Sequence, residues 1–347
     1  MKKTLVAIAA AAAVTGAYAE VTISGFVDQA VQSTTKTSTT GAKSTYNTVG
    51  NNLIGQDALN FGVTEDLGDG MTAYANINTL LFLQTGQTGA YNTDSGSGVG
   101  LKGAFGNIFL GNDYNQVWKT MAAADGSGWG AGGGAAGSVW YNTNGVGNTP
   151  RIFSYTLPSL ATGLDIVVEQ GYGNTASGVG DQTGFSVSYT SGAFMAKYAG
   201  MSLKTTSGTT TFTTYDAAGS AYAVSGALTY DGSVAAYQVA ALTYDLGVAK
   251  LFLGAESMSM NDSGDVAESK NTFGINVPFG ATTLGWGHSS STLTNNAGTQ
   301  YQTSGDKLFA KYAFSKRTNA YFTYGKSSQT GSQIGLSNTS VGLTHSF

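Results

Sequence analysis

Along most of the chain, apolar and polar residues alternate with a period of two, which is the pattern of a β-strand with two different faces. In residues 306–314, for example, Leu308 and Tyr312 share one face while Lys307 and Lys311 share the other. The pattern predicts about sixteen strands, near residues 21–32, 57–66, 71–84, 97–105, 108–114, 151–158, 164–172, 183–191, 193–203, 234–245, 248–259, 271–279, 281–291, 306–315, 318–328 and 338–347. The protein is therefore expected to be all-β.

The connections between these strands alternate between tight turns and longer stretches rich in Gly, Ser, Thr and Asn. The tight turns are Leu67–Gly70, Gly106-Asn107, Ser159–Gly163, Ser191-Gly192, Leu246-Gly247, Phe279-Gly280 and Ser315–Arg317. Short turns at one end and long loops at the other are typical of outer-membrane barrels, whose short turns face the periplasm. We therefore predict a 16-stranded antiparallel transmembrane β-barrel with both termini in the periplasm.

One segment leaves the strand count open. Ala221–Tyr230 also alternates like a strand and is followed by the turn residues 231–233. Counting it as a spanning strand would put the tight turn Leu246-Gly247 on the wrong side of the membrane. We assign it to an extended fifth loop, and a barrel of 18 strands, with two extra strands in this region, is the alternative.

Strand parity also predicts which residues face inward. It places five lysines on the inward face, namely Lys102, Lys197, Lys250, Lys307 and Lys311. A lysine on the lipid face would cost roughly 2–4 kcal/mol at the middle of the membrane. An inward face that carries lysines is polar and hydrated, and a barrel of this width can enclose a water-filled channel.

The N-terminal residues 1–19 read as a secretory signal peptide. Lys2 and Lys3 precede the apolar run Leu5–Val14, and Ala17-Tyr18-Ala19 forms a cleavage site before Glu20. We expect residues 20–347 to form the barrel domain. Without the two signal lysines, the formal charge moves from −4 to −6.

The composition narrows the possible functions. The chain has 50 glycines, 19 tyrosines, 16 phenylalanines and only 10% charged residues, which favours strands and aromatic girdles over helices. It has no cysteine, so thiolate catalysis and Cys-ligated metals are excluded. The acidic balance offers no basic surface for nucleic acid.

Several segments carry a family resemblance. They are Val21–Asp28, Gly100–Asn107 followed by Leu110-Gly111, Ser154-Tyr155 with Pro158, Phe314–Thr318 with Tyr321 and Tyr324, and the final strand Val341–Phe347. Together they resemble the general porins of Gram-negative bacteria over the whole mature chain. The resemblance implies an outer-membrane protein, usually a homotrimer, whose third loop folds inward and narrows the pore. Here that loop is Asn115–Thr149, which at 35 residues exceeds an ordinary connection.

The resemblance also implies partners. These are outer-membrane lipid and lipopolysaccharide, small hydrophilic solutes, and the barrel-assembly machinery, which would recognise the C-terminal strand ending in Phe347. In that strand, Val341, Leu343, His345 and Phe347 share the outward face, where an aromatic ring suits the membrane interface.

The sequence departs from the family at the expected constriction. The family typically has arginine after the Leu-Gly pair, where this chain has Asn112, and the only arginines are Arg151, on the outward parity, and Arg317, in a periplasmic turn. The candidate constriction residues are Lys102, Asn112, Asp113, Lys119 and Asp125. Asp113 and Asp125 are expected either to face Lys102 across the pore or to be solvated loop carboxylates.

The remaining candidate chemistry favours no enzyme. His288 and His345 are the only histidines, and parity places both on the outward face, which argues against a Ser-His-Asp hydrolase. We expect no metal cluster and no cofactor. Four aromatic residues, Trp118, Trp129, Trp140 and Tyr141, could line a path for sugars, although loop packing is the favoured interpretation.

We therefore predict a channel for passive diffusion of small hydrophilic solutes, with mild cation preference because acids exceed bases. Two rivals remain open. One is a substrate-specific channel for a sugar or an organic ion, and the other is a structural or adhesive barrel with a closed lumen.

Overall fold

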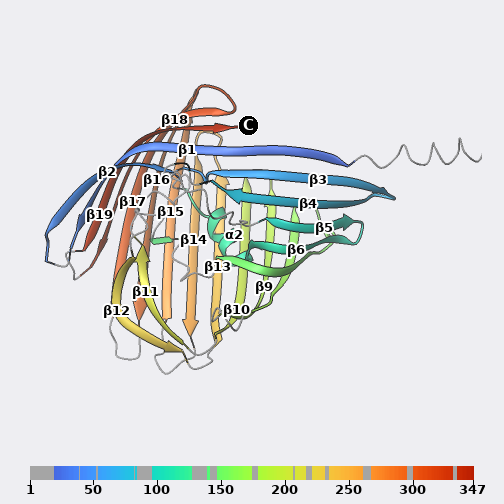
Figure 1. Ribbon diagram of the computed structural model, residues 1–347, viewed down its shortest axis with the longest axis horizontal. Helices are drawn as coiled ribbons and strands as arrows, with labels where there is room; N and C mark the ends of the chain where they lie inside the picture. Colours follow the sequence, from blue (N-terminus) through green and yellow to red (C-terminus); the bar gives the residue numbers. More distant parts are fainter. Residues whose placement is uncertain are drawn as a thin grey trace, which may run out of the picture.

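The computed structural model describes residues 19–38, 40–51, 54–81, 83, 96–126, 139–140, 147–173, 179–205, 208–215, 221–230, 234–260, 267–294, 300–330 and 334–347. Nearly all of these residues lie in antiparallel strands (Figure 1). Among them, no helix has the length and apolar character needed to cross a membrane.

The first part of the chain forms β1 (Glu20–Thr37), β2 (Lys43–Asn51), β3 (Ala58–Gly68), β4 (Met71–Leu80), β5 (Ser97–Gly103), β6 (Gly106–Tyr114), the helix α2 (Gln116–Ala123), β7 (Asn148–Thr156), β8 (Leu164–Gly171), β9 (Val179–Ser191) and β10 (Phe194–Thr205). The second part forms β11 (Gly208–Tyr215), β12 (Ala221–Tyr230), β13 (Val234–Asp245), β14 (Lys250–Met260), β15 (Ala267–Phe279), β16 (Thr282–Thr294), β17 (Gln300–Ala313), β18 (Thr318–Gln329) and β19 (Gly335–Ser346).

The sheet closes on itself because the first and last strands pair. β1 runs antiparallel to β19 from Phe26 opposite Ser346 to Thr37 opposite Gly335. Backbone hydrogen bonds between Gly25 and Phe347, at 3.0 and 3.1 Å, complete the seam. Closure leaves the barrel sheet itself without an unpaired edge strand, which is the condition for a sheet to span a lipid bilayer.

The second strand of the barrel is interrupted. β1 pairs with β2 over residues 29–37 and with β3 over residues 20–26, so β2 and β3 together occupy one position in the barrel. With β2 and β3 counted as one, the barrel has sixteen strands, as the alternation predicted. β2 itself was missed, because residues 33–56 were expected to form a long loop.

The hairpin of β11 and β12 settles the alternative strand count. β10 pairs directly with β13, while β11 and β12 pair only with each other in a separate two-stranded sheet. The assignment of Ala221–Tyr230 to the fifth loop is therefore confirmed, and the 18-stranded alternative is wrong.

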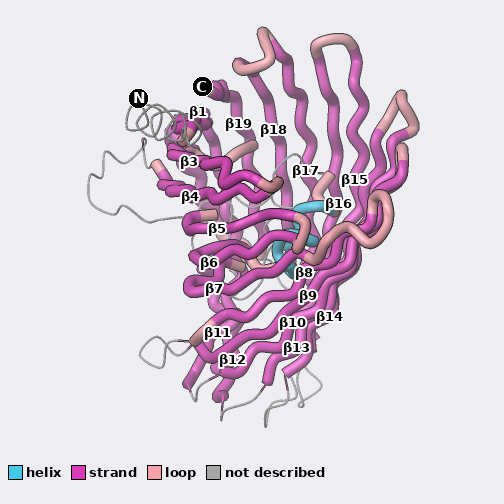
Figure 2. The backbone as a smooth tube through the Cα atoms, turned by 90° about the vertical axis from the view of Figure 1, so that its right-hand side faces the viewer, coloured by secondary structure: helices cyan, strands magenta, loops and turns pink. Residues whose placement is uncertain are grey.

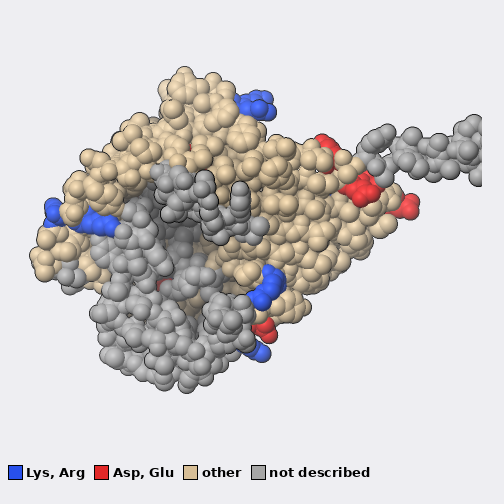
Figure 3. Space-filling model, in the orientation of Figure 1, with Lys and Arg blue, Asp and Glu red and all other residues tan. Residues whose placement is uncertain are grey.

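The two faces of the strands differ as parity predicted. On β17, Leu308 and Tyr312 are about half exposed, whereas Lys307 and Phe309 on the alternate positions are buried. Charged side chains are few on the face seen in Figure 3 and lie toward its margins. Figure 2 shows α2 on the inner side of the curved wall. The outward rows thus carry many exposed apolar side chains, while buried polar and charged side chains such as Lys307 lie on the inward rows.

Candidate functional site

The helix α2 opens the third loop, and its first turn is bound to the barrel wall. The buried side chain of Asn115 caps the helix by accepting a hydrogen bond from the Trp118 N–H at 2.9 Å. The carboxylate of Glu169, from β8, accepts a second hydrogen bond from the Gln116 N–H at 2.9 Å. A carboxylate is favourable at this end of a helix because the N-terminus carries partial positive charge.

The apolar side of α2 packs against the inward faces of neighbouring strands. Val117, Met121 and Ala124 are buried in one hydrophobic cluster. The cluster's other members are Trp140 from the loop, Ala199, Met201 and Leu203 from β10, Tyr237, Val239 and Ala241 from β13, and Met258 from β14. The start of the third loop therefore lies inside the barrel and against its wall.

The end of the helix continues along the wall through close backbone contacts. A Cβ atom added to Gly126 would lie 2.7 Å from the Cα of Gly274 on β15, so only glycine fits at this contact. The buried Trp140 donates its indole N–H to the Met121 carbonyl at 2.8 Å. Trp140 is therefore a packing residue, in agreement with the favoured interpretation.

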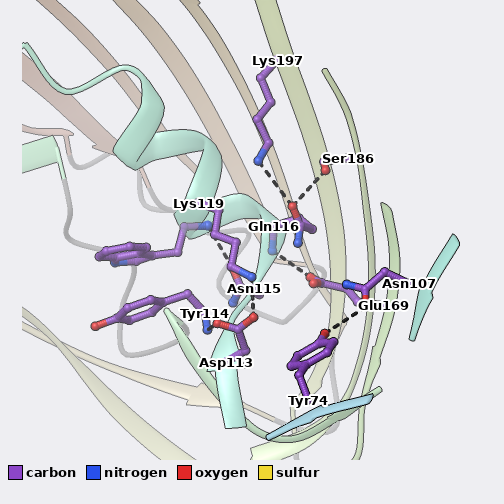
Figure 4. Close-up of polar contacts among 11 residues, drawn as sticks. Tyr74, Asn107, Asp113, Tyr114, Asn115, Gln116, Lys119, Glu169, Ser186 and Lys197 are labelled. Carbon is purple, nitrogen blue, oxygen red and sulfur yellow. Dashed lines mark hydrogen bonds and ion pairs between the residues drawn. The ribbon is translucent and has the colours of Figure 1, made fainter. Parts of the chain in front are cut away.

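Polar side chains line the space beside the helix (Figure 4). Lys119 forms an ion pair with Asp113, and the Lys119 side chain is about one-third exposed. The Gln116 side-chain oxygen accepts hydrogen bonds from the Ser186 hydroxyl at 2.9 Å and from the Lys197 ammonium at 3.4 Å. Of these groups, Lys119 and Asp113 are partly exposed and open to a solute, whereas Gln116 and Ser186 are buried against the wall.

An aromatic pair lies next to this network. The rings of Tyr114 and Trp118 stack with centroids 3.7 Å apart and planes 13° apart. The Tyr114 hydroxyl donates to the side-chain oxygen of Gln56 at 3.5 Å. Gln56 belongs to the connection between β2 and β3, so the third loop meets a second segment here.

The connection between β2 and β3 is held by two buried carboxylates. Asp28 of β1 accepts hydrogen bonds from the Ile54 N–H at 2.8 Å, from the Gly55 N–H at 3.2 Å and from the Tyr321 hydroxyl. Asp57 accepts from the Asp28 N–H and from the Gln29 side chain. Because Phe26 shares the inward parity of Asp28 and its ring contacts Gly55, the segment Ile54–Asp57 lies on the inner side of the wall.

This inner segment was missed from the sequence. The buried residues that hold it come from β1 and β18, far from it along the chain. The local signal is weak, because Asp28 is one ordinary member of the first expected strand, residues 21–32.

Two buried lysines lie beside carboxylates. Lys270 is fully buried and forms ion pairs with Glu256 at 2.7 Å and Glu268 at 3.2 Å. Ser291 donates a further hydrogen bond to Glu268 at 2.6 Å. Lys307 is also buried and interacts electrostatically with Asp125 of the third loop and with Asp28.

The five candidate constriction residues are therefore found at different places. Asp113 and Lys119 form an ion pair. Asp125 follows α2 and interacts electrostatically with Lys307. Lys102 lies at the periplasmic end of β5, opposite Asn107, so Asp113 is paired with Lys119 instead of facing Lys102. The strand register puts Asn112 on the outward row of exposed Leu110, not on the inward row of Asp113.

A β-bulge accounts for the surroundings of Asn112. Gly111 pairs with Ile152 and Asp113 with Thr149, so Pro150 and Arg151 together oppose Asn112. Arg151 has a φ of 58°, a conformation uncommon for residues other than glycine. Exposed Arg151 borders an outward hollow lined also by Leu110, Phe153 and Tyr172. Its outward position agrees with the prediction from parity.

The histidines also face outward as predicted. His288 is partly exposed beside Trp286, and His345 is exposed and within 2.9 Å of the Thr318 hydroxyl. Within the described part of the chain, no group of three or more His, Asp or Glu side chains is arranged to hold a metal ion. Trp129 and Tyr141 lie outside the described residues.

A closed barrel with an apolar outside, polar groups within and a helix folded against its inner wall is the architecture of an outer-membrane channel. The chain belongs to the Gram-negative porin family, whose sequence model matches residues 4–332. It is therefore an outer-membrane protein that forms a channel for passive diffusion.

Solved structures share this fold. An anion-selective porin from Comamonas acidovorans is 21% identical, with a TM-score of 0.72 over 95% of this chain and 100% of that chain. The trimer form of OmpT, an outer membrane protein of Vibrio cholerae, is 14% identical, with a TM-score of 0.72 over 95% of this chain and 99% of that chain. OmpF of Salmonella typhi, in complex with daunomycin, is 15% identical, with a TM-score of 0.68 over 94% and 97%. No curated protein sequence matches the chain.

Proposed function

We propose that the chain forms a water-filled pore that is narrowed by the third loop and has weak cation preference, and that it catalyses no reaction. The observation that carries the proposal is the position of α2, whose apolar side packs against the inward faces of β10 and β13. A loop fixed in this way occupies part of the lumen. The segment Ile54–Asp57, tied to Asp28, would narrow the pore from another part of the wall.

The pairing of the inward lysines supports weak cation preference. Lys119 is paired with Asp113, Lys270 with both Glu256 and Glu268, and Lys307 lies in the field of Asp125 and Asp28. Each of these three lysines is balanced by one or two carboxylates, so they add no excess of positive charge to the lining. A lining with a small negative excess would favour cations modestly.

We further propose that the pore is a homotrimer. β5 and β8 have only 7 and 8 residues, fewer than the roughly 9–11 residues of a strand that spans a bilayer. β14 to β18 have between 11 and 14 residues. Where the strands are too short to span the bilayer, contact with another protein is more favourable than contact with lipid. A second copy of this chain would supply that contact.

Residues 1–19 are proposed to be a signal peptide that is removed on export, leaving 20–347 as the barrel. The motif before Glu20 supports this assignment. Intact-mass measurement of protein purified from the outer membrane would show a chain beginning at Glu20, and retention of Met1 would contradict it.

Recordings in planar lipid bilayers test the pore. Purified, folded protein should give large conductance steps, often in groups of three, and a reversal potential in a salt gradient that favours cations. A reversal potential that favours anions would overturn the proposed selectivity while leaving the channel intact. A complete absence of steps from folded protein would overturn the pore itself and favour a closed barrel.

A second candidate function rests on the stacked pair of Tyr114 and Trp118. Aromatic faces bind the apolar faces of ring-shaped solutes, so this pair favours a channel selective for such solutes, including sugars. Saturable block of the current by a sugar, lost in Trp118→Ala and kept in Trp286→Ala on the outer surface, would support it. If the block of the current instead rose linearly with sugar concentration, the protein would be a general pore without a sugar site.

A further inference from the structure

The outward surface of β16, β17 and β18 carries a short row of ionisable side chains. His288 lies opposite Asp306, and Asp306 lies opposite Lys326 on the next strand. The His288 Nδ1 is 3.0 Å from the Asp306 Oδ1, and the Trp286 indole N–H donates to the same oxygen at 3.2 Å. The side chains of His288 and Asp306 remain 41% and 53% exposed, so the row is open to the surroundings of the barrel.

The row separates an apolar from a polar part of the outward surface. On its periplasmic side, the outward residues of these strands are Leu284 and Trp286, Leu308, Ala310 and Tyr312, and Phe322 and Tyr324. On its extracellular side they are Ser290 and Thr292, Ser304 and Gln302, and Ser328. The same change occurs on β15, from Phe273 to Asn271, and on β14, from Leu253 to Ser257. The row therefore lies at the outer limit of the apolar band.

The length and residue types of these strands indicate that this side of the barrel contacts lipid. The three strands have 12 to 14 residues, which is long enough to cross a bilayer and continue beyond it. Charged side chains are costly at the centre of a bilayer and nearly free of cost at its surface. Trp286 and Tyr324 beside the row are residue types enriched at the level of lipid headgroups.

We propose that His288, Asp306 and Lys326 form a binding site for the phosphorylated headgroup of an outer-leaflet lipid. The Lys326 ammonium would contact a phosphate oxygen. Asp306 orients the His288 ring through Nδ1, which leaves Nε2 for the same phosphate, a contact that is made when both ring nitrogens carry a proton. The acyl chains would lie along the apolar surface of Leu308 and Phe322 below.

Lipid retention tests the site directly. The folded protein would be reconstituted in vesicles of phosphatidylcholine containing phosphatidic acid, extracted in mild detergent, and its bound lipids counted by native mass spectrometry. Lys326→Gln should weaken phosphatidic acid binding about fivefold, as expected for one cation near an anionic lipid surface, and His288→Gln should also weaken it. Lys43→Gln, which removes an exposed lysine at the end of β2, is the matched control and should bind like the parent.

A free phosphate ion or a second subunit at this row would give results different from those of a lipid. If Lys326→Gln and Lys43→Gln retained phosphatidic acid equally, the proposal would be overturned. Displacement of the lipid by inorganic phosphate alone would also overturn it. Because the chain has no cysteine, Lys326→Cys provides a single labelling site. A spin label there should report the depth of the headgroups. A disulfide between subunits at this position would show that the row is a protein contact and would refute the lipid site.

Discussion

Gly126 in the third loop and Gly274 in the wall strand β15 are in direct backbone contact, and a Cβ atom on either would lie within 2.7 Å of the other's Cα. The loop is therefore held not only by the hydrophobic face of α2 but also by a contact between two main chains. The positions of these glycines decide how far the loop stands from the wall.

Gly274→Ala should displace the loop and change the pore. The added Cβ would lie 2.6 Å from the Gly126 Cα, and overpacking of this kind costs about 1–3 kcal/mol. We expect a lower unfolding temperature and a changed single-channel conductance. Gly62→Ala is the control, because its Cβ would meet the end of the Asn76 side chain at 3.2 Å, which can move. Equal behaviour of the two variants would contradict the proposed role of the contact.

The ion pair of Asp113 and Lys119 should set part of the ion selectivity. Lys119→Ala leaves an unpaired carboxylate in the lumen and should shift the reversal potential toward cations by a few-fold in permeability ratio, since unit charges about 4 Å apart interact by about 1 kcal/mol in water. Asp113→Asn should shift it the opposite way. The shifts should shrink at high salt. Lys43→Ala, outside the lumen, is the control and should leave the reversal potential unchanged. If Lys119→Ala also left the ion selectivity unaltered, the ion pair would lie away from the ion path.

Asp28 should contribute more to stability than the tyrosine that contacts it. Asp28→Ala removes three hydrogen-bond acceptor contacts, to Ile54, Gly55 and Tyr321, and should destabilise the barrel by about 3 kcal/mol or more. Tyr321→Phe removes one of them and should cost about 1–2 kcal/mol. Urea unfolding in detergent micelles measures both. Release of the segment Ile54–Asp57 should also raise the conductance in Asp28→Ala only.

Removing Lys270 should be strongly destabilising. Lys270→Met would leave Glu256 and Glu268 buried without their shared cation, and breaking a buried ion pair typically costs 3–5 kcal/mol. Adding Glu256→Gln and Glu268→Gln should recover much of the loss, because no unpaired charge then remains. Lys311→Met, at a less buried inward position, is the control. If the triple variant were no more stable than Lys270→Met, the charge explanation would fail.

The membrane-spanning strands could be predicted from the sequence because lipid and water impose opposite demands on alternate residues. That constraint ends where a strand leaves the membrane. β2, with the sequence Lys43–Asn51, is polar on both faces, so it carried no alternation although it pairs fully with β1. The helix α2 had local signals in the cap residue Asn115 and in the spacing of Val117 and Met121, but they lie in a glycine-rich loop.

Parity placed Lys197 and Lys307 on the inward face but did not identify their partners, and Lys270, which precedes the expected strand 271–279, was not among the lysines it found. Which carboxylate meets Lys270 depends on the register of β14 against β15, where Glu256 lies opposite Lys270. The surroundings of Asn112 are set in the same way, because the bulge on the neighbouring strand places Pro150 and Arg151 opposite it. Such relationships arise between strands and have no signature within one segment.

The seam between β1 and β19 has a consequence for the biogenesis of the protein. Its first pair joins Phe26 of β1 to Ser346 of β19, so the seam cannot form until both of these strands have been synthesised. Until the last strand arrives, β1 and the growing end each expose unpaired backbone groups, which invite aggregation in the aqueous compartment that the chain must cross. Contacts this distant in sequence also form slowly. The polypeptide is therefore expected to remain open until β1 and β19 pair, and pairing of the seam is the step that removes these exposed backbone groups.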